Sequence, residues 1–386
     1  MLKKIQDSAD GVEEHFPERG VLFIAGESYD APTITVLQGL QELGFDVYTI
    51  QKSNINSWFC DQVVETPAEV SFDFVLSNLH WGTRWSHYDR FDLDSYPWVL
   101  IDGDDTLEAG ITWRDKYRHY KDNYQFDPPT EVKQRELMPY RWVEPLYWYE
   151  PDIVFTSQKQ FGDDSSHYLP FGLHRQYDEM VKTRPLTHRS VNLAHIPGPG
   201  TYRERMERVI HWLSRVGVLP GEIYNDEARG KAVYPDEIAK YVQVDDNVHS
   251  YHRWKMHSEY FEVLNDSRIL VYPGIDNRPF WDSKRPWEAL ASGCFVMFSR
   301  PVIDVSEYPL TELCEYAVFN TYREFVRKYR HLYRNPEKLE RLRTQMVERA
   351  REYFSPIALA RYFLQTVHEE VSAEAVDKIG ESQAET

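Results

Sequence analysis

The residues most able to do chemistry lie together between Asn265 and Pro301. A polar loop in this stretch is followed by Pro286, which opens a short apolar helix that contains Glu288. Cations beside a helix N-terminus form a local anion site, because the unpaired amide groups and the helix dipole favour negative charge. Glu288 can accept hydrogen bonds from a ribose diol, or it can simply satisfy the amide groups that begin the helix. The loop residues considered for ligand binding are Asp276, Arg278, Lys284 and Arg285.

A second candidate anion site follows the predicted strand Val191–Ile196. The turn after it contains Gly198 and Gly200, and glycines let a backbone approach a ligand closely. The helix that follows presents its N-terminus to the same place, which favours a phosphate there. Arg203 and Arg205 open this helix and can contact the anion. Alternatively, they can pair with neighbouring glutamates on a solvated helix face.

The amino-terminal half offers candidates for a general base. His80 follows the predicted strand Phe72–Asn78, and a histidine there can bind a sugar hydroxyl, act as a base or pack beside two tryptophans. Three carboxylates end another predicted strand and can take a proton from an attacking hydroxyl. Two acids after the first strand are candidates for contacts with an acceptor. The carboxylates are Asp102, Asp104 and Asp105, and the acceptor-side acids are Glu27 and Asp30.

Alternating strands and helices must position these residues. Val21–Ala25 reads as a buried strand, Pro32 opens a helix that ends at Gly44, and Phe45–Ile50 reads as the next strand. Such a βαβ unit predicts a parallel sheet covered by helices. Further strands are predicted at Phe72–Asn78, Trp98–Ile101 and Asp152–Ser157. We therefore expect an α/β domain over residues 1–180.

A second α/β alternation predicts another domain over residues 190–355, after a basic stretch, Val181–Arg189, that resembles a linker. Ser355 and Pro356 open a last helix, expected over residues 356–372, and the polar residues 373–386 are expected to form a flexible tail. Ligands of open α/β sheets bind beyond the carboxyl ends of the strands, where the candidate residues lie. The predicted strands of this domain are Val191–Ile196, Arg268–Tyr272, Cys294–Ser299 and Tyr316–Asn320, and the first helix covers Tyr202–Val216.

Composition limits the partners. The chain of 386 residues has 44 Lys and Arg against 62 Asp and Glu, a net charge of −18, which argues against nucleic acid as a general partner. No apolar run is long enough to cross a bilayer, and the first twenty residues lack the apolar core of a signal peptide. Three scattered cysteines make neither a disulfide framework nor a zinc site. We expect a cytoplasmic protein without a transmembrane segment.

The string RPWEALASGCFV, with the strand RILVY before it, resembles the carboxyl-domain signature of GT-B glycosyltransferases. It is most similar to the CgeB-like and group-1 families, and the exostosin-type domain has a similar string. The turn Leu169–Gly172 and the segment that contains the letters NPE are also similar to family segments. The resemblance implies two Rossmann-like domains that face each other across a cleft holding a nucleotide-sugar. It also implies a carboxyl-terminal helix that crosses back to the amino-terminal domain.

The resemblance also implies roles for residues. Glu288 matches the glutamate that binds the donor ribose, and the neighbouring cations and glycine-rich turn match positions near the diphosphate. His80 resembles a histidine that faces the donor sugar. Many retaining members carry another glutamate eight residues before Glu288, where this chain has Phe280; Asp276 or Asp282 are candidates to replace it, so retention or inversion stays open. The donor-side residues implied are Lys284, Arg285, Gly198, Gly200, Arg203, Arg205, Asp276 and Arg278.

We therefore expect a glycosyltransferase (EC 2.4 class) that uses a nucleoside-diphosphate sugar as donor substrate, with no cofactor and no metal. The acceptor is a hydroxyl on a glycan, lipid, protein or small molecule. One alternative is a catalytically inactive GT-B scaffold that binds a sugar or a partner protein, which the missing glutamate favours. Another is a phosphatase of the haloacid-dehalogenase type, because LIDGDDTL would place Asp102 as nucleophile. The acid and lysine spacing after this motif argues against the phosphatase.

Overall fold

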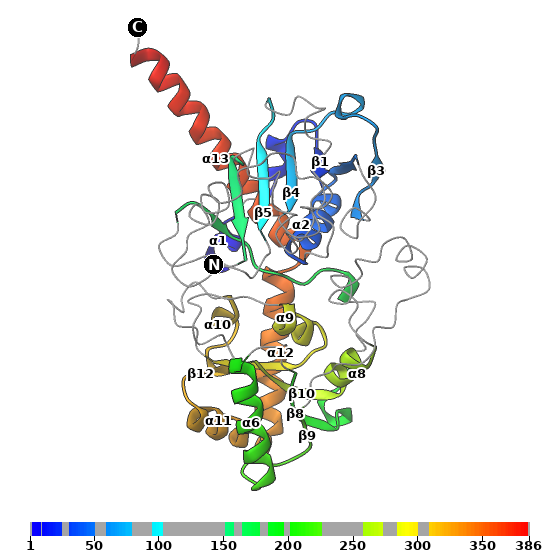
Figure 1. Ribbon diagram of the computed structural model, residues 1–386, viewed down its shortest axis with the longest axis vertical. Helices are drawn as coiled ribbons and strands as arrows, with labels where there is room; N and C mark the ends of the chain where they lie inside the picture. Colours follow the sequence, from blue (N-terminus) through cyan, green and yellow to red (C-terminus); the bar gives the residue numbers. More distant parts are fainter. Residues whose placement is uncertain are drawn as a thin grey trace, which may run out of the picture. The chain divides into compact units, whose positions relative to one another are not determined.

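The computed structural model describes residues 2–8, 10–24, 31–50, 59–78, 95–102, 151–157, 164–177, 184–196, 201–225, 258–272, 284–299 and 309–384 (Figure 1). The chain divides into two compact units. The amino-terminal unit comprises Lys3–Pro170 and Ser355–Thr386, and the carboxyl-terminal unit comprises Met1–Leu2 and Phe171–Phe354. No helix in the described part of the chain is long and apolar enough to cross a membrane.

The amino-terminal unit is built on a parallel sheet, which has seven strands within the described residues, in the order β3-β2-β1-β4-β5-β6-β7. The four central strands are buried along their whole length, as apolar strands covered on both faces must be. The predicted strands are confirmed, whereas β3 and β7 were not predicted. The bounds are β1 (Gly20–Ile24), β2 (Asp46–Thr49), β3 (Gln62–Val63), β4 (Phe74–Asn78), β5 (Trp98–Asp102), β6 (Ile153–Thr156) and β7 (His167–Tyr168).

Two long helices of this unit come from opposite ends of the sequence. Helix α2 (Ala31–Glu42) packs against α13 (Pro356–Ala384). Phe363 of α13 lies against Phe74 and Phe155 of the sheet, with ring centroids 5.9 and 4.7 Å apart. The last helix therefore crosses back onto the amino-terminal unit, as the resemblance implied (Figure 1).

Helix α13 is longer than the sequence pattern predicted. It was expected to end near residue 372 before a flexible tail, and it runs to Ala384 instead. The additional residues are mostly alanine, glutamate, lysine and glutamine, which favour helix even where no apolar face is present. The prediction of a tail rested on the polarity of residues 373–386 alone. The helix propensity of these residues extends α13 to Ala384 instead.

The contact between α2 and α13 leaves no room for a side chain at Gly39. A Cβ there would lie 2.0 Å from the carbonyl oxygen of Pro356 and 2.6 Å from the Cβ of Ala360. Glycine to alanine inside a helix normally stabilises it by about 1 kcal/mol. Here we expect Gly39→Ala to destabilise the protein by about 3 kcal/mol, because α13 must move away. Urea unfolding of the two proteins measures this.

A second variant tests whether the backbone causes the clash. Ala360→Gly removes one of the two contacts but leaves the Pro356 carbonyl in place. We expect the double variant Gly39→Ala/Ala360→Gly to remain about as unstable as Gly39→Ala. Full recovery of stability in the double variant would contradict the close backbone approach.

The carboxyl-terminal unit has a five-stranded parallel sheet within the described residues, in the order β12-β11-β10-β8-β9. The predicted strand Tyr316–Asn320 is only partly right, because its first residues belong to a 3₁₀ turn, Glu315–Ala317. The strands are β8 (Val191–His195), β9 (Ile223–Asn225), β10 (Ser267–Tyr272), β11 (Phe295–Ser299) and β12 (Val318–Phe319). The helices are α6 (Thr201–Arg215), α8 (Ser258–Asp266), α9 (Lys284–Ala291), α10 (Pro309–Leu313), α11 (Tyr322–Arg334) and α12 (Pro336–Tyr353).

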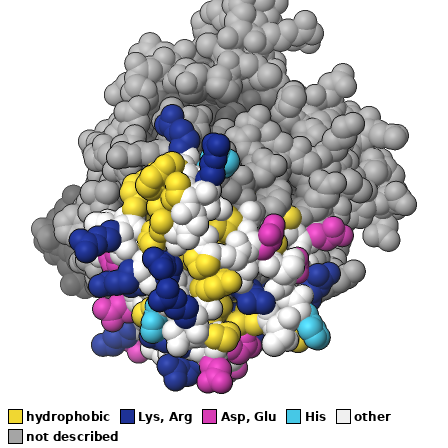
Figure 2. Space-filling model, turned by 90° about the horizontal axis from the view of Figure 1, so that it is seen from below, with side chains coloured by type: hydrophobic (Ala, Val, Ile, Leu, Met, Phe, Trp, Pro, Cys, Tyr) yellow, Lys and Arg dark blue, Asp and Glu magenta, His cyan; other side chains and the backbone are white. Residues whose placement is uncertain are grey.

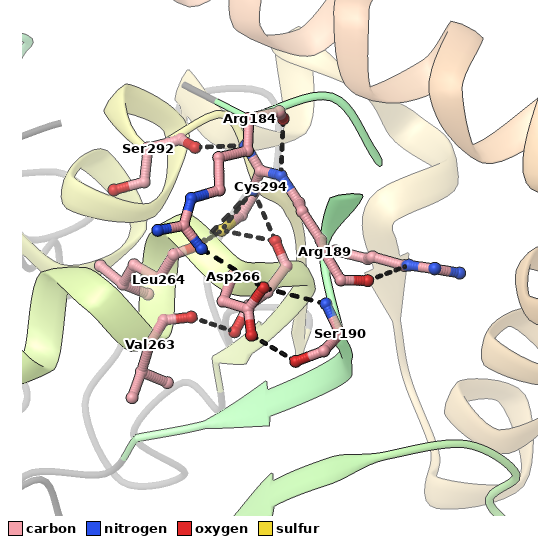
Figure 3. Close-up of polar contacts among 10 residues, drawn as sticks. Arg184, Arg189, Ser190, Val263, Leu264, Asp266, Ser292 and Cys294 are labelled. Atoms are coloured by element: carbon pink, nitrogen blue, oxygen red, sulfur yellow. Dashed lines mark hydrogen bonds and ion pairs between the residues drawn. The ribbon is translucent and has the colours of Figure 1, made fainter. Parts of the chain in front are cut away.

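The end of the expected linker, Arg189, is buried in the carboxyl-terminal unit (Figure 3). Its guanidinium donates from Nη1 to the carbonyl oxygen of Ser267 at 2.6 Å and from Nη2 to that of Ser292 at 2.7 Å. Nε donates to the carbonyl oxygen of Arg184 at 2.9 Å. Burial lowers the pKa of Arg189, and it raises the pKa of the neighbouring Cys294 thiol to about 11. Arg189 therefore connects three carbonyl groups in the interior of this unit, and the prediction that it belongs to a linker is wrong.

Candidate functional site

The carboxyl ends of β8 and β10 lie next to each other in the carboxyl-terminal unit. The two strands pair in parallel, with Ile269 opposite Leu193 and Leu270 opposite Ala194. The chain therefore leaves β8 and β10 at the same edge of the sheet. Both predicted anion-binding segments begin at this edge, where open α/β sheets bind ligands.

Helix α9 places Glu288 and Lys284 one helical turn apart. The Lys284 Nζ atom lies 3.7 Å from Oε1 of Glu288. The Glu288 side chain is only 1% exposed and that of Lys284 is 22% exposed, so the carboxylate is buried beneath its cation. A buried carboxylate requires such compensation, because desolvation otherwise disfavours its charge. Arg285 is partly exposed beside them.

The apolar residues of α9 hold these groups in place. Trp287 is completely buried, and its ring packs edge-on against Phe354 with centroids 4.9 Å apart. Leu290 and Ala289 are also fully buried. The helix is therefore anchored along its apolar side, and Glu288 is carried on this anchored segment.

A buried histidine that the sequence did not single out, His174, is influenced by the charge of Lys284. Its ring is buried and stacks on Tyr177 with centroids 3.8 Å apart. Burial, and secondarily the positive charge of Lys284, lower the pKa of His174 to about 3. The backbone amide of Leu173 donates to the carbonyl oxygen of Phe354 at 2.8 Å, which fastens this segment next to α9. A neutral imidazole therefore accompanies the cation and the carboxylate.

The buried His174 makes stability depend on pH. Its pKa is about 3 in the folded protein and near 6.5 when unfolded, so below pH 6.5 the unfolded chain takes up a proton that the folded chain does not. Between pH 6.5 and 5, this residue lowers the free energy of unfolding by about 1.4 kcal/mol per pH unit. We expect His174→Gln to flatten that slope in urea titrations. His188→Gln, at an exposed position, is the control, and equal slopes for the wild type and His174→Gln would contradict the burial.

In the amino-terminal unit, Asp102 ends β5 and is completely buried. It lies opposite Thr156 of β6, and Asn78 at the end of β4 pairs in register with Ile101. The amide of Ser157 donates to the carbonyl oxygen of Asp102 at 3.3 Å. Buried polar residues thus follow three adjacent strands at one edge of the sheet. Asp102 is one of the buried polar residues at this edge of the sheet.

The remaining sequence-predicted residues are placed only in part. Arg203 and Arg205 lie in the first turns of α6, but their side chains are outside the described atoms. The other candidates lie outside the described residues, and their roles stay predictions. These are Gly198, Gly200, Asp276 and Arg278 on the donor side, and His80, Asp104, Asp105, Glu27 and Asp30 in the amino-terminal unit.

Comparison with known proteins identifies the class of the carboxyl-terminal region. The sequence model of the family described as glycosyl transferase-like matches residues 203–365, which include all of α9 and most of α6. The match confirms the resemblance to glycosyltransferases carried by the sequence around Glu288, and with it the enzyme class. No curated protein matches the sequence.

Several solved structures are similar to the chain over most of its length. Sucrose-phosphate synthase from Thermosynechococcus elongatus is 12% identical with a TM-score of 0.45, over 92% of this chain and 99% of that one. HepE from Anabaena, in complex with UDP, is 10% identical with a TM-score of 0.46, over 91% and 100%. An alpha-glucosyltransferase in complex with UDP and a 13-mer DNA is 10% identical with a TM-score of 0.49, over 87% and 95%.

Proposed function

We propose that this chain, whose residues 203–365 match the glycosyl transferase-like family, transfers a sugar from a nucleoside-diphosphate sugar to a hydroxyl acceptor. The observation that carries the proposal is the buried Glu288 carboxylate, 3.7 Å from Lys284 in the first turns of α9. This pair lies at the sheet edge where α/β folds bind ligands. The Glu288 carboxylate can accept hydrogen bonds from a ribose diol, and the neighbouring Lys284 can bind a diphosphate. The pair therefore fits the two polar parts of a nucleotide.

The roles of the site residues follow from the charges that develop during sugar transfer. The acceptor oxygen attacks the anomeric carbon, the bond from that carbon to the diphosphate oxygen breaks, and a base takes the acceptor proton. Negative charge grows on the departing nucleoside diphosphate, where Lys284, Arg285 and the start of α9 stabilise it. The base belongs to the amino-terminal set of His80, Asp102, Asp104 and Asp105.

A nucleotide screen tests the proposal directly. The intact protein is heated with UDP, GDP, CDP, ADP and their common sugar conjugates in the presence of EDTA. A ligand at about 100 times its dissociation constant stabilises the folded state by about 2.7 kcal/mol, so we expect a shift of several degrees with one nucleotide. No shift with any of them would contradict the proposal and favour the inactive scaffold. Phe280, which stands where many retaining members carry a glutamate, is consistent with that alternative.

Metal independence is part of the same proposal. Arginine, lysine and helix termini neutralise the leaving diphosphate, so we expect sugar transfer to proceed at an unchanged rate after EDTA treatment. The measurement is the release of nucleoside diphosphate, with and without added Mg²⁺ or Mn²⁺. Activity that EDTA abolishes and Mn²⁺ restores would show that a metal carries the diphosphate instead.

The three cysteines bear on where this chemistry takes place. Cys60, Cys294 and Cys314 are all free thiols and all buried. Free thiols persist in reducing compartments. We therefore propose the cytoplasm as the site of action.

A further inference from the structure

Three large hydrophobic side chains are exposed at the ends of two helices of the carboxyl-terminal unit. Trp212 is 62% exposed and Val216 is 51% exposed at the end of α6, and Tyr333 is 41% exposed at the end of α11. Among the described residues, the fourth exposed large hydrophobic residue is Val63, in the other unit. Trp212 and Val216 are four residues apart and so lie on the same side of the helix end, and exposed apolar side chains that gather in one patch mark an interaction surface. We call Trp212, Val216 and Tyr333 the aromatic corner.

The two helix ends meet in space. The Tyr329 hydroxyl of α11 donates to the carbonyl oxygen of Pro220, in the loop that follows α6, at 2.6 Å. A Cβ at Gly221 would lie 2.7 Å from Cε2 of Tyr333. The loop after α6 therefore rests against the end of α11. Figure 2 shows hydrophobic side chains on the face seen from below, with lysine and arginine side chains around them and aspartate and glutamate side chains in between.

Exposed arginines surround the aromatic corner. Arg208 and Arg215 lie four residues before and three residues after Trp212, on the same side of α6. On α11, Arg330 lies three residues before Tyr333, and Arg334 is the residue directly after it. Among the described residues, none of the four has an ion-pair partner. Among the side chains that the structure describes, the exposed acids close to these four arginines in sequence are Glu222 and Glu337.

The four arginines around the aromatic corner stand out because the whole chain carries a net charge of −18. Residues 171–354 hold 28 Lys and Arg against 26 Asp and Glu, a net charge of +2. The rest of the chain holds 16 against 36, a net charge of −20. An anionic surface would therefore repel the residues outside 171–354, whereas residues 171–354 are close to neutral and allow a local basic cluster to act.

We propose that the aromatic corner binds the surface of an anionic membrane. Trp212, Val216 and Tyr333 enter the headgroup layer, where aromatic rings are favoured, and the four arginines contact lipid phosphates. The candidate donor site stays free, because α6 begins at the carboxyl edge of the sheet and ends at the opposite edge. The surface is thus separate from the site around Glu288.

A second copy of the chain fits this surface less well. Pairing of two aromatic corners would bring Arg208, Arg215, Arg330 and Arg334 against the same four cations. The acidic unit of another copy would match the charge, but among its described residues it offers only Val63 as an exposed large hydrophobic partner. A lipid surface provides both the negative charge and the apolar layer.

Co-sedimentation of the intact protein with vesicles tests the proposal. One vesicle is phosphatidylcholine with about a third phosphatidylglycerol, and the other is phosphatidylcholine alone. We expect binding to the first only, and a loss of about tenfold or more in the partition constant for Trp212→Ser/Val216→Ser and for Arg208→Glu/Arg215→Glu. Val63→Ser and Arg351→Glu are matched controls at exposed positions, and they should bind like the wild type.

Other outcomes overturn the proposal. Absence of vesicle binding by the wild type, or equal binding by both double variants, would exclude this surface as a membrane contact. Sedimentation velocity that shows dimers lost in Trp212→Ser, without vesicle binding, would assign the corner to a second copy. Binding of a single-stranded oligonucleotide that depends on the same residues, again without vesicle binding, would assign it to nucleic acid. Unchanged circular dichroism and nucleotide-dependent melting shifts establish that the variants fold.

Discussion

We expect the replacement of Glu288 by glutamine to lower kcat/KM for the nucleotide-sugar by about 10²- to 10³-fold. The carboxylate is expected to accept two charge-assisted hydrogen bonds from the ribose diol, each worth about 1.5–3 kcal/mol. Glutamine keeps the shape but loses the charge, and its amide nitrogen presents a donor where an acceptor is needed. Because burial fixes the side chain, it cannot turn away to relieve this mismatch. Initial rates at several donor concentrations measure the effect.

The controls separate binding from folding. Glu337→Gln makes the same chemical change at an exposed position of the same unit and should leave kcat/KM unchanged. The melting shift produced by the best nucleotide should disappear in Glu288→Gln while the protein without ligand still melts cooperatively. Retention of both the nucleotide shift and the rate in Glu288→Gln would remove this carboxylate from the donor site and reduce it to a helix-stabilising group.

Replacing Arg189 by methionine is expected to cost the largest amount of stability of the changes considered, about 3–5 kcal/mol. Methionine fills a similar volume but supplies no donors, so the carbonyl oxygens of Ser267 and Ser292 lose their hydrogen bonds to the guanidinium, and Ser267 keeps only the weak donor Cys294 Sγ at 3.4 Å among the bonds described. Each buried acceptor left without a partner costs about 1–3 kcal/mol. The Cys294 thiol, 3.7 Å from Nη1, also loses its neighbour. Urea unfolding, followed by tryptophan fluorescence, gives the free energy of unfolding.

Two further variants show whether the hydrogen-bond geometry or the charge matters. Arg189→Lys keeps the charge but cannot reach several carbonyl groups with a planar fork, so we expect a loss between those of the wild type and Arg189→Met. Arg184→Ala removes a half-exposed side chain and should cost less than about 0.5 kcal/mol, because only its carbonyl oxygen contacts Arg189. A cost for Arg189→Met no greater than that for Arg184→Ala would contradict the structural role.

The central strands could be predicted because their sequences permit little else. β1, β4 and β5 are short apolar runs bounded by polar or turn residues, and a run of that length is typical of a strand buried on both faces. The two-residue strands β3 and β7 have no such pattern, since pairing with a neighbour alone defines them. Likewise, the length of α13 follows from helix propensity rather than from an apolar stripe.

In the candidate site, too, some residues could be predicted from the sequence and others could not. Glu288 could be predicted because Pro286, the apolar residues around it and the preceding cations are all local in sequence. His174 could not, because its low pKa comes from burial and from Lys284, more than a hundred residues away. Arg189 looked like part of a linker, since a basic residue near proline and threonine is ordinarily exposed. Two of its partners are the carbonyl groups of Ser267 and Ser292, which lie 78 and 103 residues away, and only the folded chain brings them together.

The return of α13 to the first unit sets an order for biosynthesis. Residues 171–354 are contiguous, so the second unit can complete its core as soon as it has emerged from the ribosome. The first unit, although translated earlier, must wait for the final segment, because Phe363 covers Phe74 and Phe155 only when residues beyond 355 have been made. At about 5–20 residues per second, that uncovered surface persists in the nascent chain for ten seconds or more. A chaperone that binds apolar surface would therefore act on the amino-terminal half of the nascent chain, and a premature stop near residue 354 would leave that half permanently incomplete.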